Sequence, residues 1–469
     1  MLFDSFQYIL FLPLTVLIYY LIPHKFRWVF LLLASYYFYM SWQIEYALLI
    51  LFTTTVDYFI SQKIYKTTSR KTKKLLLLSS MTVNLGILFF FKYFNFINSS
   101  IQDVLSQFNI FYNKPELKVL LPVGISFYTF QILSYTLEVY QGKQKPEKHF
   151  GYFALYVVFF PQLVAGPIER FSRLAPQFRQ KINFSWVNFN NGLRLILFGL
   201  FIKMVIADNL APLVNEVYNK PEVYNSLSIL QALFFYSFQI YSDFFGYSTI
   251  AVGSAMMMGI FIMDNFKTPY LAKSISEFWN RWHISLSTWF RDYLFIPLGG
   301  SRVKKYRFFL NILIVFTVSG LWHGANWTFF IWGLLHAIYY IFETLKKKVF
   351  PLQQTKSWGL VNIASVIGTF LLVSLAWIFF RSESFSKALM IFNSLFNNYG
   401  VQDTFVVSNI IWLLLAFFII LDIILYNKRF DTWIVSKNFI FRWSVYTVLL
   451  FSILALAGIN YNPFIYFQF

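Results

Sequence analysis

Cysteine is absent from the 469-residue sequence. Its absence excludes disulfides, thiolate metal ligands and a cysteine nucleophile supplied by the chain, so any thioester must come from a donor or a partner. Charge is also scarce, since charged residues make up 13% of the chain while 58% of the residues are hydrophobic and 22% are aromatic. Apolar runs of about 15 to 22 residues recur throughout, as bilayer spans require. The composition therefore predicts an all-α, polytopic membrane protein.

The formal net charge is +19. Such an excess can indicate nucleic-acid binding, but here the basic residues lie in short loops between apolar runs, where the positive-inside rule places them. We therefore expect contacts with membrane lipids and none with nucleic acid. Following these loops predicts about 11 to 12 transmembrane helices in the cytoplasmic (inner) membrane, with both termini outside. The first run lacks the basic start and cleavage site of a signal peptide and is predicted to be a retained span.

The segment 150–168 has basic residues on both sides and contains FFPQLVAGPI, with two prolines and a glycine. Parity of the loops predicts a re-entrant hairpin here. Broken backbone at membrane depth is tolerated only where protein or a water-filled cavity covers it. The sequence thus predicts re-entrant segments around a central cavity open to both faces. The long apolar region 227–263 is left open as one helix or a broken one, and no internal repeat supports a transporter built from inverted repeats.

His323 is the strongest catalytic candidate, because it lies in the apolar stretch FTVSGLWHGANWTFFIWGLLHAIYY. An ionisable side chain is costly at membrane depth and usually serves a pathway or a reaction. Imidazole titrates near neutral pH, so it can accept and return a proton in one turnover. The neighbouring small residues Gly320, Gly324 and Ala325 let backbone or ligand approach closely. Asn326 offers an amide partner.

His283 lies in EFWNRWHISLSTWFRDYLFIPLGG, a tryptophan-rich stretch on the predicted cytoplasmic side, which favours a role in handling a donor. Other polar residues admit structural interpretations. Asp243 is suited to bonding neighbouring helices, Arg291 and Asp292 to an interfacial ion pair, and His336 to packing or a hydrogen bond. No further histidine or carboxylate stands at a clear metal-ligand spacing, so we expect no metal site.

Six motifs follow one another from Leu121 to Ala337: PVGISFYTFQILSY, FFPQLVAGPIERF, IKMVIADNLA, QIYSDFFGYSTIAVGSAMMMGI, FWNRWHISLSTWFRDYLFIPLGG and GLWHGANWTFFIWGLLHA. Each would be weak alone, but as a set they resemble the membrane-bound O-acyltransferase superfamily. Within it the chain resembles the bacterial branch typified by the membrane subunit of alginate O-acetyltransferase, and the closing FIYFQF is similar too. Phe245 stands where the branch usually has serine, which we expect to alter packing near Asp243 without abolishing chemistry.

The resemblance implies that His323 matches the essential buried histidine of the superfamily and His283 its second, more cytoplasmic histidine, both catalytic. It implies one membrane domain over residues 1–469, with N-terminal spans (1–118), a motif core (119–345) and C-terminal spans (346–469). Neighbouring side chains are then expected to bind substrate or donor: Asn280, Arg281, Trp282, Arg291, Asp292, Trp322, Asn326 and Asp243.

The function implied is O-acyl transfer, most simply of an acetyl group, from a cytoplasmic thioester such as acetyl-coenzyme A to a cell-surface or secreted polysaccharide. No permanently bound cofactor is expected. The resemblance further implies an extracytoplasmic serine acetyltransferase as partner. Two alternatives stay open: transfer of D-alanine from a carrier protein to teichoic acid, and proton-coupled polysaccharide export. Alginate, peptidoglycan, another exopolysaccharide or a secreted metabolite would each suit as acceptor.

Overall fold

The computed structural model describes residues 1–164, 166–349, 360–398, 405–457 and 464–465. Within these ranges every regular element is helical and no strand occurs, which confirms the all-α fold. Ala165 of the expected hairpin and the last four residues of the closing motif fall outside them.

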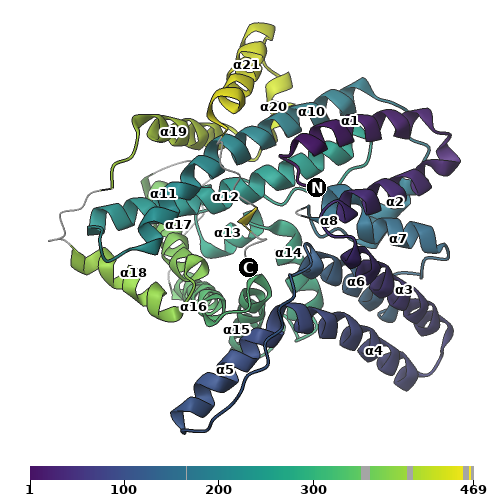
Figure 1. Cartoon of the computed structure of the whole chain (residues 1–469), viewed down its shortest axis with the longest axis horizontal. Helices are drawn as coiled ribbons and strands as arrows, with labels where there is room; N and C mark the ends of the chain where they lie inside the picture. The colour runs from purple at the N-terminus through teal and green to yellow at the C-terminus, as the bar shows by residue number, and fades with distance from the viewer. Residues whose placement is uncertain (165, 350–359, 399–404, 458–463, 466–469) are drawn as a thin grey trace. The chain divides into compact units, whose positions relative to one another are not determined.

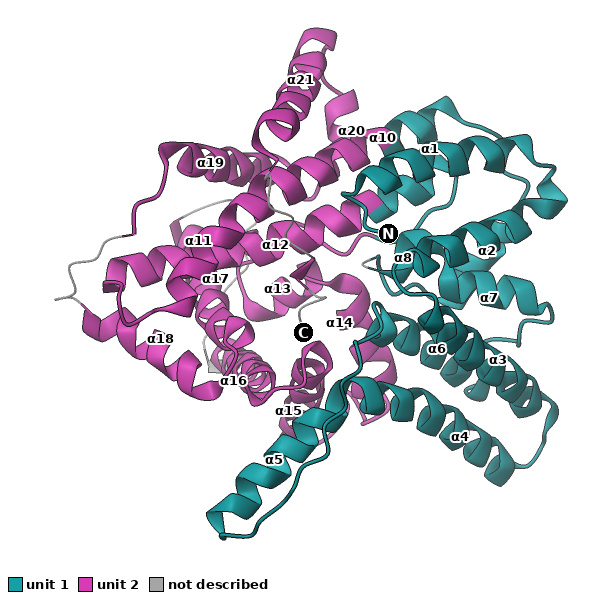
Figure 2. Cartoon of the chain, in the orientation of Figure 1, with its two compact units in different colours: residues 1–192, 251–263 teal, residues 193–250, 264–469 magenta. Residues whose placement is uncertain are grey.

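The chain packs into two compact units (Figure 2). Unit 1 comprises residues 1–192 and 251–263, and unit 2 comprises residues 193–250 and 264–469. The single membrane domain and its three expected parts stay a prediction.

Unit 1 contains the helices that precede α10 (Figure 1). They are α1 (Phe6–Leu21), α2 (His24–Met40), α3 (Glu45–Lys66), α4 (Arg70–Leu88), the π-helix η1 (Phe89–Tyr93), α5 (Phe94–Gln107), α6 (Ile125–Tyr140), α7 (Phe150–Val158), α8 (Phe160–Leu163) and α9 (Phe171–Arg179). Serine caps start two of them, because Ser5 accepts a hydrogen bond from the Tyr8 N–H and Ser69 from the Thr72 N–H. Such caps satisfy amides that have no partner inside the helix.

A buried carboxylate joins three helices of unit 1. Asp57 of α3 has no exposed surface. Its carboxylate accepts hydrogen bonds from Ser80 Oγ and Asn84 Nδ2 of α4, both at 2.5 Å. Thr136 Oγ1 of α6 donates to it at 2.7 Å. Polar groups between apolar helices must find partners within the protein, so these bonds fix the register of α3, α4 and α6.

The break expected in the segment 150–168 is present, since α7 ends before α8 begins. In a continuous helix the Tyr156 carbonyl would accept the Phe160 N–H. Here the Phe160 N–H donates to Ser35 Oγ at 3.1 Å. The side-chain amides of Gln131 and Gln162 donate instead to the Tyr156 carbonyl, each at 2.5 Å. The broken backbone is therefore satisfied by side chains of unit 1, as it must be where water is excluded.

Unit 2 contains the remaining helices, including parts of two that also contribute to unit 1 (Figure 1). They are α10 (Trp186–Leu200), the π-helix η2 (Phe201–Ala207), α11 (Asp208–Asn219), α12 (Ser226–Met257), the 3-10 helix η3 (Pro269–Leu271), α13 (Ile275–Arg281), α14 (Ile284–Phe290), the π-helix η4 (Arg291–Phe295), α15 (Lys305–His323), α16 (Trp327–Val349), α17 (Leu360–Arg381), α18 (Phe385–Asn397), α19 (Asn409–Ile424), α20 (Phe430–Val435) and α21 (Phe439–Leu456). Most of the region left open in the sequence forms one unbroken helix, α12, of 32 residues, which ends at Met257.

Six helical segments of the described residues are long and apolar enough to cross a membrane: Arg70–Gln107, Trp186–Asn219, Lys305–His323, Trp327–Lys347, Leu360–Arg381 and Phe439–Leu456. Two shorter apolar helices, α1 and α19, join them. The protein is therefore a multi-pass membrane protein. The expected number of 11 to 12 spans stays a prediction.

Two glycines bring α15 and α16 into close contact. A Cβ atom on Gly320 would lie 2.2 Å from the Phe329 carbonyl oxygen, and one on Gly333 would lie 2.3 Å from the Phe316 carbonyl oxygen. Neither position tolerates a larger side chain without a shift of backbone. The small residues near His323 thus allow α16 to pack closely against α15. His323 is the last residue of α15.

Candidate active site

The two histidines predicted to be catalytic lie side by side in unit 2. His323 is the last residue of α15 and is 2% exposed, and His283 directly precedes α14 and is fully buried. Their ring centroids are 6.3 Å apart. Histidine is the commonest general acid and base in enzymes, so two neighbouring buried imidazoles mark a candidate site for proton transfer.

Aromatic rings enclose this pair. His323 packs against Trp332 of α16 and Phe380 of α17, with ring centroids at 5.1 and 5.4 Å. His283 packs against Phe244 of α12 at 4.7 Å, edge to face. Trp322 contacts both histidines, at 5.0 Å from His323 and 6.0 Å from His283. The shell excludes bulk water, which strengthens electrostatic interactions inside the site. The cavity open to both faces stays a prediction.

The backbone of His283 has an unusual conformation. Its φ of 42° and ψ of 53° fall in the left-handed region, which residues other than glycine rarely adopt. Backbone held in such a region costs of the order of 1–3 kcal/mol and clusters at functional sites. The conformation ends α13 and starts α14, so it turns the His283 side chain toward His323.

A loop pairing holds His283 in this conformation. The Ile284 N–H donates to the Asn265 carbonyl at 3.0 Å, and the Ser285 N–H donates to Asn265 Oδ1 at 3.2 Å. On the other side, the Lys267 N–H donates to the Arg281 carbonyl at 3.0 Å. The segment before η3 therefore runs along the turn that carries the histidine. Sequence reasoning missed Asn265, because a polar residue in a loop gives no periodic signal.

Burial determines the protonation state of His283. Loss of hydration disfavours the imidazolium and lowers the pKa of His283 to about 3. The ring is therefore neutral at physiological pH. A base whose conjugate acid is that strong transfers protons poorly near pH 7.

Arg281 lies beside the site but is occupied by structural bonds. Its guanidinium donates to Glu277 at 2.9 Å and to the Tyr426 hydroxyl at 2.8 Å. It also donates to the Lys267 carbonyl at 3.0 Å and to Asn427 at 3.1 Å. These bonds tie α13 to the segment that follows α19. Arg281 therefore positions the His283 turn.

Two tryptophans of the predicted set contribute to the walls. Trp282 is fully buried and packs against Trp377 of α17 at 5.2 Å and against Phe278 at 5.5 Å. Trp322, described above, is 4% exposed. The contributions of Trp377 and Phe380 were not predicted, because α17 carries no polar motif that would mark it as part of the site.

Asp243 is part of a buried ionic cluster. Its Oδ1 lies 2.8 Å from the ammonium of Lys203, which also contacts Asp208 at 2.6 Å. Its Oδ2 accepts a hydrogen bond from the Ile465 N–H at 2.6 Å. Lys203 is 1% exposed, so this cluster is shielded from water. Asp243 bonds neighbouring segments, in line with the structural interpretation of its sequence position.

Asn326 is engaged at the start of α16. Its Nδ2 donates to the Glu383 carbonyl at 2.7 Å, and its Oδ1 accepts from the Thr328 N–H at 3.0 Å. It therefore caps α16, as asparagine commonly does. Next to it, Gly324 is required by packing, since a Cβ there would lie 2.0 Å from the Phe329 ring.

The other predicted residues are at the surface. Asn280 is exposed, and Arg291 pairs with its neighbour Asp292 at 2.9 Å, with 60% and 32% of their side chains exposed. His336, by contrast, is buried and accepts a hydrogen bond from Trp279 Nε1 at 3.3 Å, as expected for a packed histidine. Among the described residues no three histidine, aspartate or glutamate side chains gather as a metal site would require.

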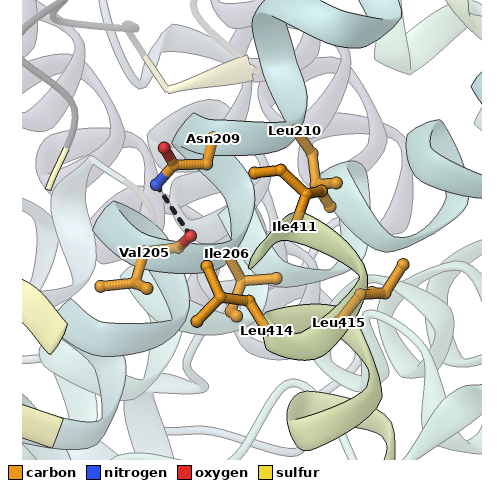
Figure 3. A pocket seen from close by; sticks show the side chains of 7 residues that line it. All are labelled: Val205, Ile206, Asn209, Leu210, Ile411, Leu414 and Leu415. Carbon is orange, nitrogen blue, oxygen red and sulfur yellow. Dashed lines mark hydrogen bonds between the residues drawn. The ribbon is translucent and has the colours of Figure 1, made fainter. Parts of the chain in front are cut away.

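Two cavities lie away from the histidines. In unit 2, a crevice of about 10 Å³ is lined by Val205, Ile206, Asn209, Leu210, Ile411, Leu414 and Leu415 (Figure 3). Asn209 points its amide to the Val205 carbonyl at 2.9 Å, and the space holds at most one water. In unit 1, a cavity of about 350 Å³ is lined by residues of the loop before α7 and of α9, including Lys145, Lys148 and Arg179.

Comparisons with known proteins identify the family of this chain. Residues 148–386 match the family model of membrane-bound O-acyltransferases. The chain is 35% identical to a probable alginate O-acetylase of Pseudomonas putida, over 98% of each chain. It is 37% identical to a peptidoglycan O-acetyltransferase of Helicobacter pylori, over 79% of this chain and 74% of the relative. It is 31% identical to a teichoic acid D-alanyltransferase of Bacillus subtilis, over 56% of this chain and 69% of the relative.

Proposed function

Because this chain belongs to the membrane-bound O-acyltransferase family, we propose that His323 and His283 form its active centre and move an acetyl group from a cytoplasmic thioester to a hydroxyl destined for a cell-surface or secreted polysaccharide. The protein is a membrane O-acyltransferase. The observation that carries the assignment of residues is the pairing of two buried imidazoles at 6.3 Å inside an aromatic shell.

His323 accepts the proton of the attacking hydroxyl in the proposed reaction. The hydroxyl oxygen bonds to the acyl carbon, the carbon–sulfur bond breaks, and His323 returns the proton to the departing sulfur. The products are an ester and a free thiol. His283, kept neutral by burial, orients one of the reacting groups through a hydrogen bond. The thioester is acetyl-coenzyme A in this proposal, and no bound cofactor is needed.

The proposal places the protein in the cytoplasmic membrane with both termini outside, as the basic loops predict. The chain offers no cysteine, so the acyl group is not held on a thiol of this protein. An extracytoplasmic serine acetyltransferase is the proposed partner that completes transfer to the polysaccharide. The names of the alginate and peptidoglycan relatives support a polysaccharide acceptor.

A second candidate is D-alanyl transfer to teichoic acid. The teichoic acid D-alanyltransferase relative matches only 56% of this chain, whereas the alginate relative matches 98%. The shared part is thus consistent with a common acyl-transfer core, and the full-length match favours acetyl transfer. Feeding cells labelled acetate or labelled D-alanine and following the label into ester-linked surface material separates the two.

The test replaces the native copy by His323→Ala and measures O-acetyl groups on the surface polysaccharide at matched membrane protein levels. We expect acetylation to be lost. His149→Ala is the matched control, because His149 is exposed and distant in sequence from both site motifs. Unchanged acetylation in the His323→Ala strain would remove this histidine from the mechanism.

A further inference from the structure

Two buried polar groups beside His283 have no structural assignment. Asn265 is 1% exposed and Ser285 has no exposed surface. Asn265 Nδ2 and Ser285 Oγ each form no hydrogen bond with any residue that the structure describes. A buried donor left without a partner costs about 1–3 kcal/mol. Such groups are rare in folded proteins, and catalytic use is one of the recognised reasons for keeping them.

The orientation of the Asn265 amide follows from its bonds. Its Oδ1 accepts the Ser285 N–H at 3.2 Å, so Nδ2 is the end of the amide that remains for another acceptor. Its backbone carbonyl accepts the Ile284 N–H at 3.0 Å. Asn265 is thereby fixed against the two residues that directly follow His283. A donor fixed in advance needs no rearrangement during the reaction.

The Ser285 hydroxyl belongs to the same small region, because its own backbone amide is bonded to the Asn265 side chain. Other hydroxyls of α14 are used within the helix: Ser287 Oγ donates to the Trp282 carbonyl at 3.2 Å and Thr288 Oγ1 to the Ile284 carbonyl at 2.8 Å. Ser285 is the hydroxyl of this helix that lies fully buried and unassigned among the described residues.

We propose that Asn265 Nδ2–H and Ser285 Oγ–H donate hydrogen bonds to the carbonyl oxygen of the acyl group and stabilise the negative charge that develops on it. This inference rests on the proposed function, since it supplies the donors that acyl transfer at His323 requires. Attack of the hydroxyl oxygen on the acyl carbon moves the carbonyl π electrons onto oxygen, and the hydroxyl proton goes to His323. Collapse of the oxyanion breaks the carbon–sulfur bond, and the sulfur takes the proton.

Two replacements test the donors with little change to the fold. Asn265→Asp keeps an oxygen that accepts the Ser285 N–H but removes the Nδ2 donor. Ser285→Ala removes only the hydroxyl, and Ser285→Thr keeps one. Ser287→Ala is the matched control on α14. Initial rates are measured in membrane vesicles of the native host, supplied with labelled acetyl-coenzyme A from the cytoplasmic side, at matched protein levels.

Loss of one such donor lowers kcat on the order of 100-fold in enzymes that stabilise an oxyanion. We expect that fall for Asn265→Asp and for Ser285→Ala, with little change in KM, recovery in Ser285→Thr, and the wild-type rate in Ser287→Ala. Rates within threefold of wild type for both donor variants would overturn the inference. So would a loss of rate that Ser285→Thr fails to restore, or one fully explained by a lower unfolding temperature.

The His323→Ala variant, measured in the same vesicles, separates this inference from the proposed function. If His323→Ala abolishes transfer while Asn265→Asp and Ser285→Ala run at the wild-type rate, the active centre stands and the oxyanion donors are wrong. If His323→Ala transfers acetyl at the wild-type rate, the proposed active centre is wrong. The proposal for the oxyanion donors, which rests on that centre, is then wrong as well.

Discussion

His283 and His323 lie with their ring centroids 6.3 Å apart, one directly before α14 and the other at the end of α15. The pairing depends on two short-range devices. The left-handed backbone of His283 sets the direction of its side chain. The glycine contacts between α15 and α16 hold the helix that carries His323.

Acid should destabilise the fold partly through His283. Its folded pKa of about 3 lies below the ordinary value of 6.5, so the unfolded chain binds the proton more readily. The stability that depends on neutral His283 is fully present above pH 6.5. The free energy of unfolding then decreases as the pH falls from 6.5 toward 3. At pH 5 the loss is about 2 kcal/mol at 1.36 kcal/mol per pKa unit. Thermal unfolding in detergent should show a smaller drop between pH 7 and pH 5 for His283→Gln than for wild type. An equal drop in both would contradict the prediction.

Arg281→Met should slow acetylation, because the four partners of the guanidinium anchor the His283 turn. A small displacement of a reacting group costs on the order of 10- to 100-fold in rate. Arg281→Lys keeps the charge but not the planar fork, and should give an intermediate rate. Arg302→Met serves as control, since that side chain is exposed and lies outside the residues expected to bind substrate or donor. Incorporation of labelled acetyl in vesicles measures the rates of the three variants, and a slow Arg302→Met would speak against a specific role for Arg281.

Lys203→Met should strongly destabilise unit 2. It leaves the carboxylates of Asp208 and Asp243 without their shared cation in a buried place, and breaking one partner of a buried ion pair costs about 3–5 kcal/mol. Lys387→Met breaks the surface pair with Glu383 and should change stability by less than about 1 kcal/mol. The unfolding temperature of the purified proteins compares them. Similar temperatures for the two variants would show that the buried cluster adds little.

Gly320→Ala should impair folding, because the new Cβ would lie 2.2 Å from the Phe329 carbonyl oxygen. Forcing a methyl group into a packed interface costs about 1–3 kcal/mol. Gly368→Ala, on α17, meets nothing within 4 Å and should be neutral or stabilising, since alanine favours helix by about 1 kcal/mol over glycine. Protein recovered from membranes and its unfolding temperature report both effects. A stable Gly320→Ala would mean that α15 and α16 separate easily.

Local sequence signals predicted much of the helical framework. The two prolines and the glycine of FFPQLVAGPI predicted the broken backbone where α7 ends and α8 begins. This feature is set by residues close in sequence, because proline lacks the N–H donor that a helix needs. The histidine candidates came from apolar context and from family resemblance, which the pairing at 6.3 Å supports.

The contacts between segments far apart in sequence, which complete the site, were not predicted. The segment around Asn265 bonds to the end of α13 and the start of α14, and no periodicity in the sequence marks this pairing. The sequence shows the charge of Arg281 but not the groups to which its guanidinium donates. Its partner Tyr426 follows a helix more than a hundred residues later. Tertiary contacts of this kind decide whether a polar side chain is free to bind a substrate.

The carboxylate of Asp57 has a consequence for how the protein is made. Two of its donors, on α4, emerge from the ribosome soon after α3, whereas the third, Thr136, arrives only with α6. Alone in lipid, α3 would carry an expensive unpartnered group. We therefore expect α3 and α4 to insert into the membrane together, with Ser80 and Asn84 as the first partners of Asp57 and Thr136 as the last.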